Sequence, residues 1–238
     1  MSYFDNMVKP CLLDRLRVQQ PTIPADYILA YDFNGNVLDK STKLNHGILD
    51  GNYTFESVTD ANNKTLNGIT FNNGVVETSK NLFEGIDTNK VSLSLWAKTT
   101  QTSQFILAEL SPNYNPFLNA FLLYTVTRNI ALSQRMIDPG IYHSIIDGRI
   151  NDGLWYHIVI TSDKDLPANV MGNIYINGAP VSVTNSSEKN TLNYNKTVPL
   201  FIGRRNPSTL PYIGSVSKFK VYPRIITEEE VTQLYNEL

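Results

Sequence analysis

The chain has 238 residues, of which 42% are hydrophobic and 18% are charged. This composition excludes a disordered chain, and the length permits one large all-β domain or two small ones. The 20 basic and 22 acidic residues give a formal net charge of -2, which leaves no electrostatic basis for binding nucleic acid or an anionic membrane. The single cysteine, Cys11, has no partner for an internal disulfide, and we interpret it as an apolar packing residue rather than a catalytic thiol.

The first residues predict neither a signal peptide nor a membrane anchor. Several charged side chains interrupt residues 1–17, and no apolar run in the chain approaches the roughly 18 to 20 residues that a membrane helix needs. We therefore expect a soluble protein without membrane insertion. If it works at the exterior of a cell or on a virion, we expect it to reach that place without a cleaved signal peptide.

Residues 1–25 differ from the rest of the chain. Leu12, Leu13 and Leu16 fall on one side of a short amphipathic turn, and Pro21 and Pro24 then predict an extended connector. We interpret this segment as an N-terminal arm. A strand or turn that caps the main domain is the alternative, and the sequence leaves both open.

From Tyr27 onward the pattern becomes that of β-strands. Runs rich in Ile, Val, Tyr and Phe alternate with clusters of Asn, Gly, Asp, Ser and Thr. Asn177-Gly178 lies between two such runs and predicts a tight hairpin, because both residues tolerate positive φ. Thr227 followed by Glu230 is a capping-box pattern and predicts a C-terminal helix with Val231 and Leu234 on its apolar face. The predicted strands cover residues 28–33, 68–77, 91–97, 105–110, 121–127, 155–161, 173–176, 179–183, 200–203 and 214–222.

The order of these elements resembles that of a known family. An aromatic strand leads to Asp39 and an Asn45-His46-Gly47 step, and later runs carry Trp96, then Trp155-Tyr156-His157, then the final strand and helix. Together they resemble the laminin-G-like domains of the concanavalin A-like lectin and glucanase family. The resemblance implies an all-β, two-sheet antiparallel sandwich of jelly-roll type over residues 26–238, with a short C-terminal helix and the arm at residues 1–25. Ser217-Lys218 stands where the family often has Asp-Glu, so any role of those acids is in doubt here.

The sequence argues against hydrolysis. Glycosidases of this fold carry a Glu-x-Asp-x-x-Glu run or a similar one, since cleavage needs two carboxylates. Glu109 stands alone in its predicted strand, and Asp163 and Asp165 lie in a predicted loop. His46, His143 and His157 lack metal-ligand spacing, and His46 and His157 are interpreted as core or turn residues. We therefore predict no catalytic residue.

A structural calcium ion is the one cofactor that the sequence suggests. Calcium is held by six to eight oxygen ligands, and relatives of this fold hold such an ion near the first turn. The candidate ligands here are Asp39, the preferred one, with Asp32, Asn34 and Asn45. The alternative is that these residues only form turn hydrogen bonds.

The long loops are the predicted binding surface, because loops on a rigid sandwich vary freely. Aromatic, amide and arginine side chains suit stacking on and hydrogen bonding to sugars, and they suit protein interfaces equally well. The candidate ligand-binding residues are Tyr114, Asn115, Tyr194, Arg204 and Arg205.

These observations predict a non-catalytic module on a virion surface, such as a phage decoration or tail-associated protein. Residues 1–25 would anchor it to other virion proteins, and the domain would present a surface for glycan or protein contact, with homo-oligomers as a further option. A free carbohydrate-binding lectin or adhesin is the first alternative, and a glycoside hydrolase is the second.

Overall fold

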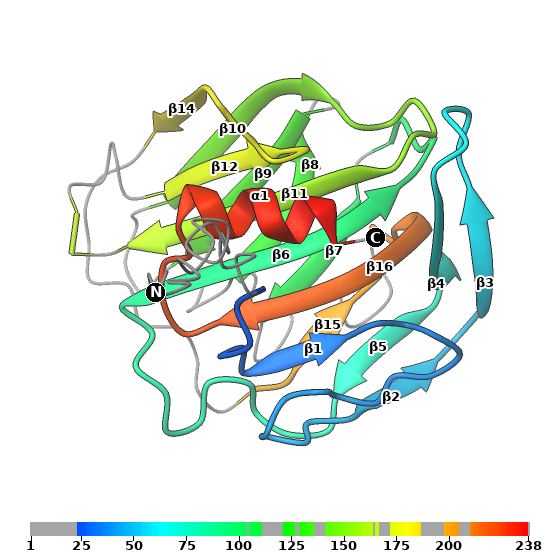
Figure 1. The fold of residues 1–238 in the computed structure, drawn as a ribbon, viewed down its shortest axis with the longest axis horizontal. Coiled ribbons are helices and arrows are strands. Elements are labelled where there is room, and N and C mark those ends of the chain that lie inside the picture. The colour runs from blue at the N-terminus through cyan, green and yellow to red at the C-terminus, as the bar shows by residue number, and fades with distance from the viewer. Residues whose placement is uncertain are drawn as a thin grey trace, which may run out of the picture.

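The computed structural model is a sandwich of two antiparallel β-sheets with one helix (Figure 1). The structure describes residues 23–103, 105–110, 121–126, 129–135, 141–163, 165–166, 172–186, 198–204 and 210–237; the side chains of Ile106 and of residues 121–149 and 184–186 are not among them. Within this part of the chain, no helix is long and apolar enough to span a membrane.

The first sheet, sheet A, has eight strands in the order β13-β12-β11-β6-β16-β4-β3, with β1 pairing with β16 beside this path. Its strands are β1 (Leu29–Tyr31), β3 (Tyr53–Thr59), β4 (Thr65–Asn72), β6 (Lys90–Lys98), β11 (Tyr156–Asp163), β12 (Gly172–Ile176), β13 (Ala179–Val181) and β16 (Ile213–Tyr222).

Sheet B also has eight strands, in the order β14-β10-β9-β8-β7-β15-β5-β2. Its strands are β2 (Gly47–Asp50), β5 (Val75–Thr78), β7 (Ile106–Leu110), β8 (Phe121–Val126), β9 (Asn129–Arg135), β10 (Ile141–Arg149), β14 (Val183–Ser186) and β15 (Leu200–Ile202). The predicted two-sheet sandwich is therefore confirmed.

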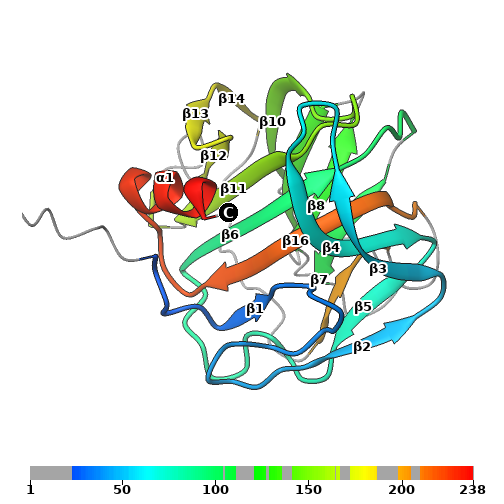
Figure 2. The same ribbon diagram turned by 45° about the vertical axis from the view of Figure 1, so that its right-hand side comes forward.

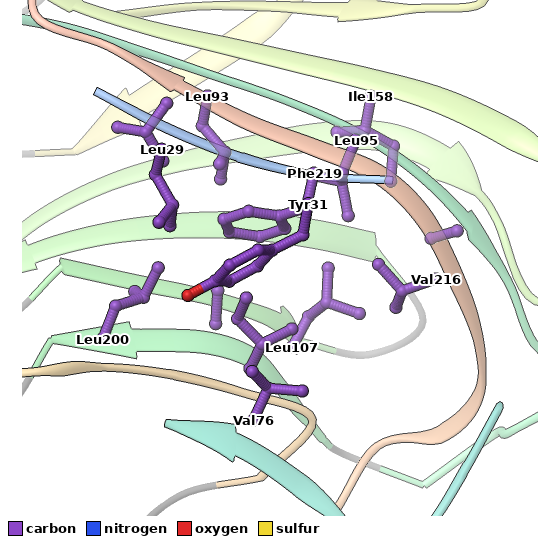
Figure 3. Close-up of a cluster of buried hydrophobic side chains, with 14 of the residues drawn as sticks. Leu29, Tyr31, Val76, Leu93, Leu95, Leu107, Ile158, Leu200, Val216 and Phe219 are labelled. Carbon is purple, nitrogen blue, oxygen red and sulfur yellow. The ribbon is translucent and has the colours of Figure 1, made fainter. Parts of the chain in front are cut away.

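Alternating side chains of both sheets meet between them and form the core. Leu93 and Leu95 of β6 and Ile158 of β11 face Val76 and Leu200 of sheet B (Figure 3). All five are less than 3% exposed. Period-2 alternation therefore sends the other side chains of these strands to the outer faces.

The helix α1 (Glu228–Asn236) lies across the outer face of sheet A, in front of β6 and β11 (Figure 1). Its predicted capping box is present, since the Thr227 hydroxyl accepts from the Glu230 amide and Glu230 Oε2 accepts from the Thr227 amide at 2.8 Å. Val231 and Leu234 are buried as expected. The predicted hairpin is also present, with φ values of 52° at Asn177 and 81° at Gly178 between β12 and β13.

Several strands were missed by sequence reasoning, namely β2, β3, β9, β10 and the separate β14. In β2 and β3 no side chain is fully buried, so their sequences lack the apolar run that marks a buried strand. Pro24, at the end of the predicted arm, is buried, and its carbonyl oxygen accepts from the Tyr222 hydroxyl at 3.3 Å. Residues 1–22 lie outside the described residues, so an anchoring role for the arm stays a prediction.

Candidate ligand-binding rim

Three turns pack closely at one end of the sandwich and form what we call the rim: residues 51–52 between β2 and β3, residues 73–74 between β4 and β5, and residues 203–204 after β15. A Cβ atom on Gly51 would lie 2.5 Å from the carbonyl oxygen of Asn73, and one on Gly74 would lie 2.5 Å from that of Asn52. Gly203 has a φ of 101°, and a Cβ there would lie 2.9 Å from the Gly74 oxygen. Only glycine permits these backbone contacts, which fix the three turns against one another.

A hollow of about 480 Å³ opens beside the rim, within the size range of small-molecule sites. It is lined by Gly51, Asn52, Tyr53, Thr54, Thr70 and Asn72, none of which is charged. Tyr53 is 37% exposed, and its ring contacts Phe55 edge-to-face, with ring centroids 5.8 Å apart.

Some polar groups of the hollow are already hydrogen-bonded within the protein, and others are not. The Thr70 hydroxyl pairs with Ser215 Oγ at 2.8 Å, and the Thr54 hydroxyl donates to Glu56 Oε1 at 3.1 Å. The Asn72 amide N–H donates to the Asn52 carbonyl oxygen at 3.0 Å and ties β4 to the β2–β3 turn. The side-chain amides of both asparagines form no hydrogen bond with any residue that the structure describes. They remain available to a ligand.

Arg204, one of the predicted ligand-binding residues, is part of this rim. Its guanidinium forms an ion pair with Asp50 at the end of β2. The Arg204 side chain is 15% exposed, whereas the Asp50 side chain is 74% exposed. The arginine is therefore the enclosed member of the pair.

The other predicted ligand residues, Tyr114, Asn115, Tyr194 and Arg205, lie outside the described residues. The strands that flank two of their segments are described: β7 ends at Leu110, which pairs with Leu200 at the start of β15. Leu110 therefore lies beside the first residue of β15, while Arg204 follows the last residues of that strand.

The first turn, where calcium was predicted, is held by Asp39. Its Oδ1 accepts from the amides of Ala30 and Ser41, both at 2.9 Å, and its Oδ2 accepts from the Asn45 amide at 2.8 Å and the Ser41 hydroxyl at 2.6 Å. These bonds occupy the acceptor positions of the carboxylate. Asp39 is 4% exposed, so it is a buried support of the turn.

The remaining candidate ligands do not complete an ion site. The Asn45 side chain bonds to Lys80 through both of its polar atoms, and Asp32 and Asn34 are exposed. Among the described residues, no group of three His, Cys, Asp or Glu side chains is placed to hold a metal. The donor set does not fit a calcium ion without displacing hydrogen bonds of the protein, and calcium binding stays a prediction.

The residues that replace the family's acids in β16 have structural partners. The Ser217 hydroxyl donates to the Asn67 carbonyl oxygen at 2.5 Å, and Lys218 Nζ donates to the Glu237 carbonyl oxygen. Lys220 is 4% exposed and forms an ion pair with the Glu237 carboxylate. Ser217 therefore links β16 to β4, and the two lysines bind the end of α1 to the sheet.

Strand register reveals a second acid near Glu109 that the sequence did not indicate. Glu77 of β5 and Glu109 of β7 both pair with Phe201 of β15, and alternation places all three on the outer face of sheet B. Two strand spacings separate the acids, or about 10 Å between backbones. Phe201 is 6% exposed and Glu109 is 1% exposed, so only Glu77 is accessible in this row. Of these three side chains, one is an accessible carboxylate, whereas glycoside hydrolysis uses two.

His157 is a core residue, as its position in the tryptophan-containing strand predicted. It is 1% exposed, its Nε2 lies 3.0 Å from Ser94 Oγ, and its ring centroid lies 5.2 Å from that of Trp96. Burial, together with the neighbouring positive charges of Lys220, Lys64 and Lys218, lowers the pKa of His157 to about 3. The imidazole is therefore neutral near pH 7 and enclosed away from substrates.

The comparisons with known proteins agree with this architecture. Domain 4 of AbnA, a GH43 extracellular arabinanase from Geobacillus stearothermophilus solved in complex with arabinotriose, matches with a TM-score of 0.70 and 19% identity over 89% of this chain and 98% of that one. The binding domain of Paraclostridial Mosquitocidal Protein 1 matches with a TM-score of 0.64 and 16% identity, and the receptor-binding domain of botulinum neurotoxin type G with 0.60 and 15%.

The two toxin matches each cover 89% of this chain. The chain spans about half of those domains, 52% of the Paraclostridial one and 51% of the type G one. No match was found among curated protein sequences. The family model described as concanavalin A-like lectin/glucanases superfamily matches residues 67–232, which is most of the chain. This chain belongs to the concanavalin A-like lectin/glucanase superfamily, as a domain of the laminin G type.

Proposed function

We propose that this protein is a non-catalytic glycan-binding module whose binding site is the hollow beside the rim. The observation that carries the proposal is the lining of the hollow, where an exposed aromatic ring stands beside two unused amides and no charged group. Sugars bind through this combination, since their C–H faces stack on aromatic rings and their hydroxyls bond to planar amides.

The packing of the rim supports the proposal. Asn52 and Asn72 are joined through their backbones, and Gly51 and Gly74 lie against the opposite turns. A site whose backbone is already fixed loses less entropy when it binds a ligand. The similarity to a domain solved with arabinotriose supports a sugar as the ligand class.

Binding without cleavage is part of the proposal. On the outer face of sheet B, Glu109 is 1% exposed while Glu77 is accessible, and the hollow itself has no acid in its lining. We expect purified protein to release no reducing sugar from a polysaccharide panel. Release that disappears in the Glu77→Gln variant would establish a glycosidase instead.

The binding test is a glycan array followed by titration calorimetry of the best saccharide. Tyr53→Ala should weaken binding by about 1 to 2 kcal/mol, a factor of roughly 5 to 30, because the stacking surface is removed. Leu166→Ala is a matched control, since Leu166 is 39% exposed and Tyr53 is 37% exposed, but Leu166 does not line the hollow. Equal affinity of wild type and Tyr53→Ala would rule out the hollow as the site.

We further propose, from the sequence, that the module works on a virion surface with residues 1–25 as its anchor. Its support is the predicted arm, whose last residues lead into the domain where Tyr222 binds Pro24. Deletion of residues 1–22 tests it, because these precede the contacts of Pro24 and Asp26 with the domain. We expect the truncated protein to bind glycan normally and to be lost from particles. Unchanged incorporation into particles would contradict the anchor.

A further inference from the structure

We propose that the rim favours acidic saccharides, with Arg204 binding the ligand's carboxylate and Asp50 occupying that position when no ligand is present. The proposal rests on the hollow being the glycan site, and it names the class of glycan. It assigns specificity to an ion pair rather than to the aromatic ring.

Arg204 is placed where a sugar in the hollow would reach it. Asp50 directly precedes Gly51 and Asn52, which line the hollow. Gly203 packs against Gly74 at the same rim. The ion pair therefore stands at the border of the hollow, outside its uncharged lining.

The two members of the ion pair are not equivalent. The Arg204 side chain is mostly enclosed at 15% exposure, and its only partner in the described part of the chain is one oxygen of Asp50. A guanidinium carries five N–H donors and binds carboxylates best through two parallel bonds. Asp50 is 74% exposed, so the protein holds it weakly and a ligand carboxylate can replace it.

Besides Asp50, the acid Glu56 sets the orientation of such a ligand. Glu56 accepts from the hydroxyl of Thr54, which lines the hollow. An acidic group of the ligand near Glu56 would be repelled, whereas the same group near Arg204 would be attracted. The carboxylate of the sugar is therefore expected at the Arg204 border and its apolar face at Tyr53.

The test compares sugars that differ in one group. The methyl glycosides of glucose and galactose and those of glucuronic and galacturonic acid are titrated at low salt, with binding followed by NMR of the rim amides. The wild type is compared with Arg204→Gln, Asp50→Asn and Tyr53→Ala. Lys90→Gln is the matched control, because Lys90 also forms ion pairs, with Asp163 and Asp165, but lies at the far end of β6 from the rim.

We expect a uronide to bind the wild type at least fivefold more tightly than its neutral counterpart. Arg204→Gln should abolish this preference and leave the affinity for the neutral sugar unchanged. Asp50→Asn should raise uronide affinity at least twofold, because it removes the competing carboxylate. Lys90→Gln should change neither affinity, and the preference should shrink at high salt.

The failures are distinguishable. Binding that depends on Tyr53 but shows no uronide preference, or a preference that survives Arg204→Gln, overturns the role of Arg204 and leaves the glycan site standing. No binding of any of the four sugars, together with a blank glycan array, overturns the glycan site and this inference with it.

Discussion

The rim and the cluster under α1 use the same kinds of group in opposite ways. Under the helix, Trp96 is 1% exposed, stacks on Tyr235 with centroids 5.6 Å apart, and has Lys64 Nζ 4.1 Å from its ring. At the rim, Tyr53 is 37% exposed and the amides beside it are unused. Strand β3 joins the two regions, because Tyr53 at its start lines the hollow and Val58 near its end packs against the cluster of Trp96 and Tyr235. Figure 2 shows α1 on the left and β3 on the right. In the cluster under α1, side chains of the protein itself pack against the Trp96 ring. At the rim, the Tyr53 ring is left for a ligand.

The sharpest way to test this comparison is to remove Trp96. Trp96→Ala deletes a buried ring together with its stack on Tyr235 and its contact with Lys64, so we expect a loss of about 3 to 5 kcal/mol in the free energy of unfolding. Urea denaturation measures it. Glycan affinity of the folded fraction should be unchanged, and a parallel loss of binding would show that the two regions are coupled.

The pH dependence of stability tests the same cluster. The pKa of His157 is about 3 in the folded protein, well below its ordinary value of 6.5, so the unfolded chain binds a proton that the folded chain does not. Stability is therefore full above pH 6.5 and falls as the pH drops toward 3, by up to about 1.4 kcal/mol per pH unit. Denaturation between pH 7 and 4.5 checks this slope. The slope should flatten in His157→Gln, and the same slope in both proteins would contradict the assignment.

Glycine substitutions at the rim distinguish a fixed turn from a free one. Gly51→Ala requires a Cβ at a φ of 76° and 2.5 Å from the Asn73 oxygen, and we expect a loss of about 2 to 4 kcal/mol with weaker glycan binding. Gly35→Ala is the control, because its φ of 74° is similar but no atom lies within 4 Å of the added Cβ. It should cost about 1 kcal/mol, by thermal unfolding, and leave binding intact.

The features that the sequence predicted are those coded by neighbouring residues, whereas contacts between distant segments were not predicted. The capping box at Thr227 and the Asn177-Gly178 turn are local, and the sequence predicted both correctly. The rim depends on Gly51, Gly74 and Gly203, whose contacts join segments far apart in the chain, so no local pattern reveals them. The pairing of Glu77 and Glu109 with Phe201 likewise needs the register across three strands. Asp39 was recognised as special, and its hydrogen bonds identify it as a support of the turn.

The smallest predicted effect concerns Lys64, the cation of the α1 cluster. Its Nζ lies 4.1 Å from the Trp96 ring centroid and 4.9 Å from that of Tyr235, while burial lowers its pKa. Lys64→Gln keeps a polar side chain, one atom shorter, but removes the charge, and we expect a loss of about 0.5 to 1 kcal/mol in stability. Lys40→Gln, at an exposed position, should cost nothing measurable. If Lys64→Gln instead stabilises the protein, desolvation of the ammonium outweighs its attraction to the rings, and the cluster would owe its stability to the aromatic stack alone.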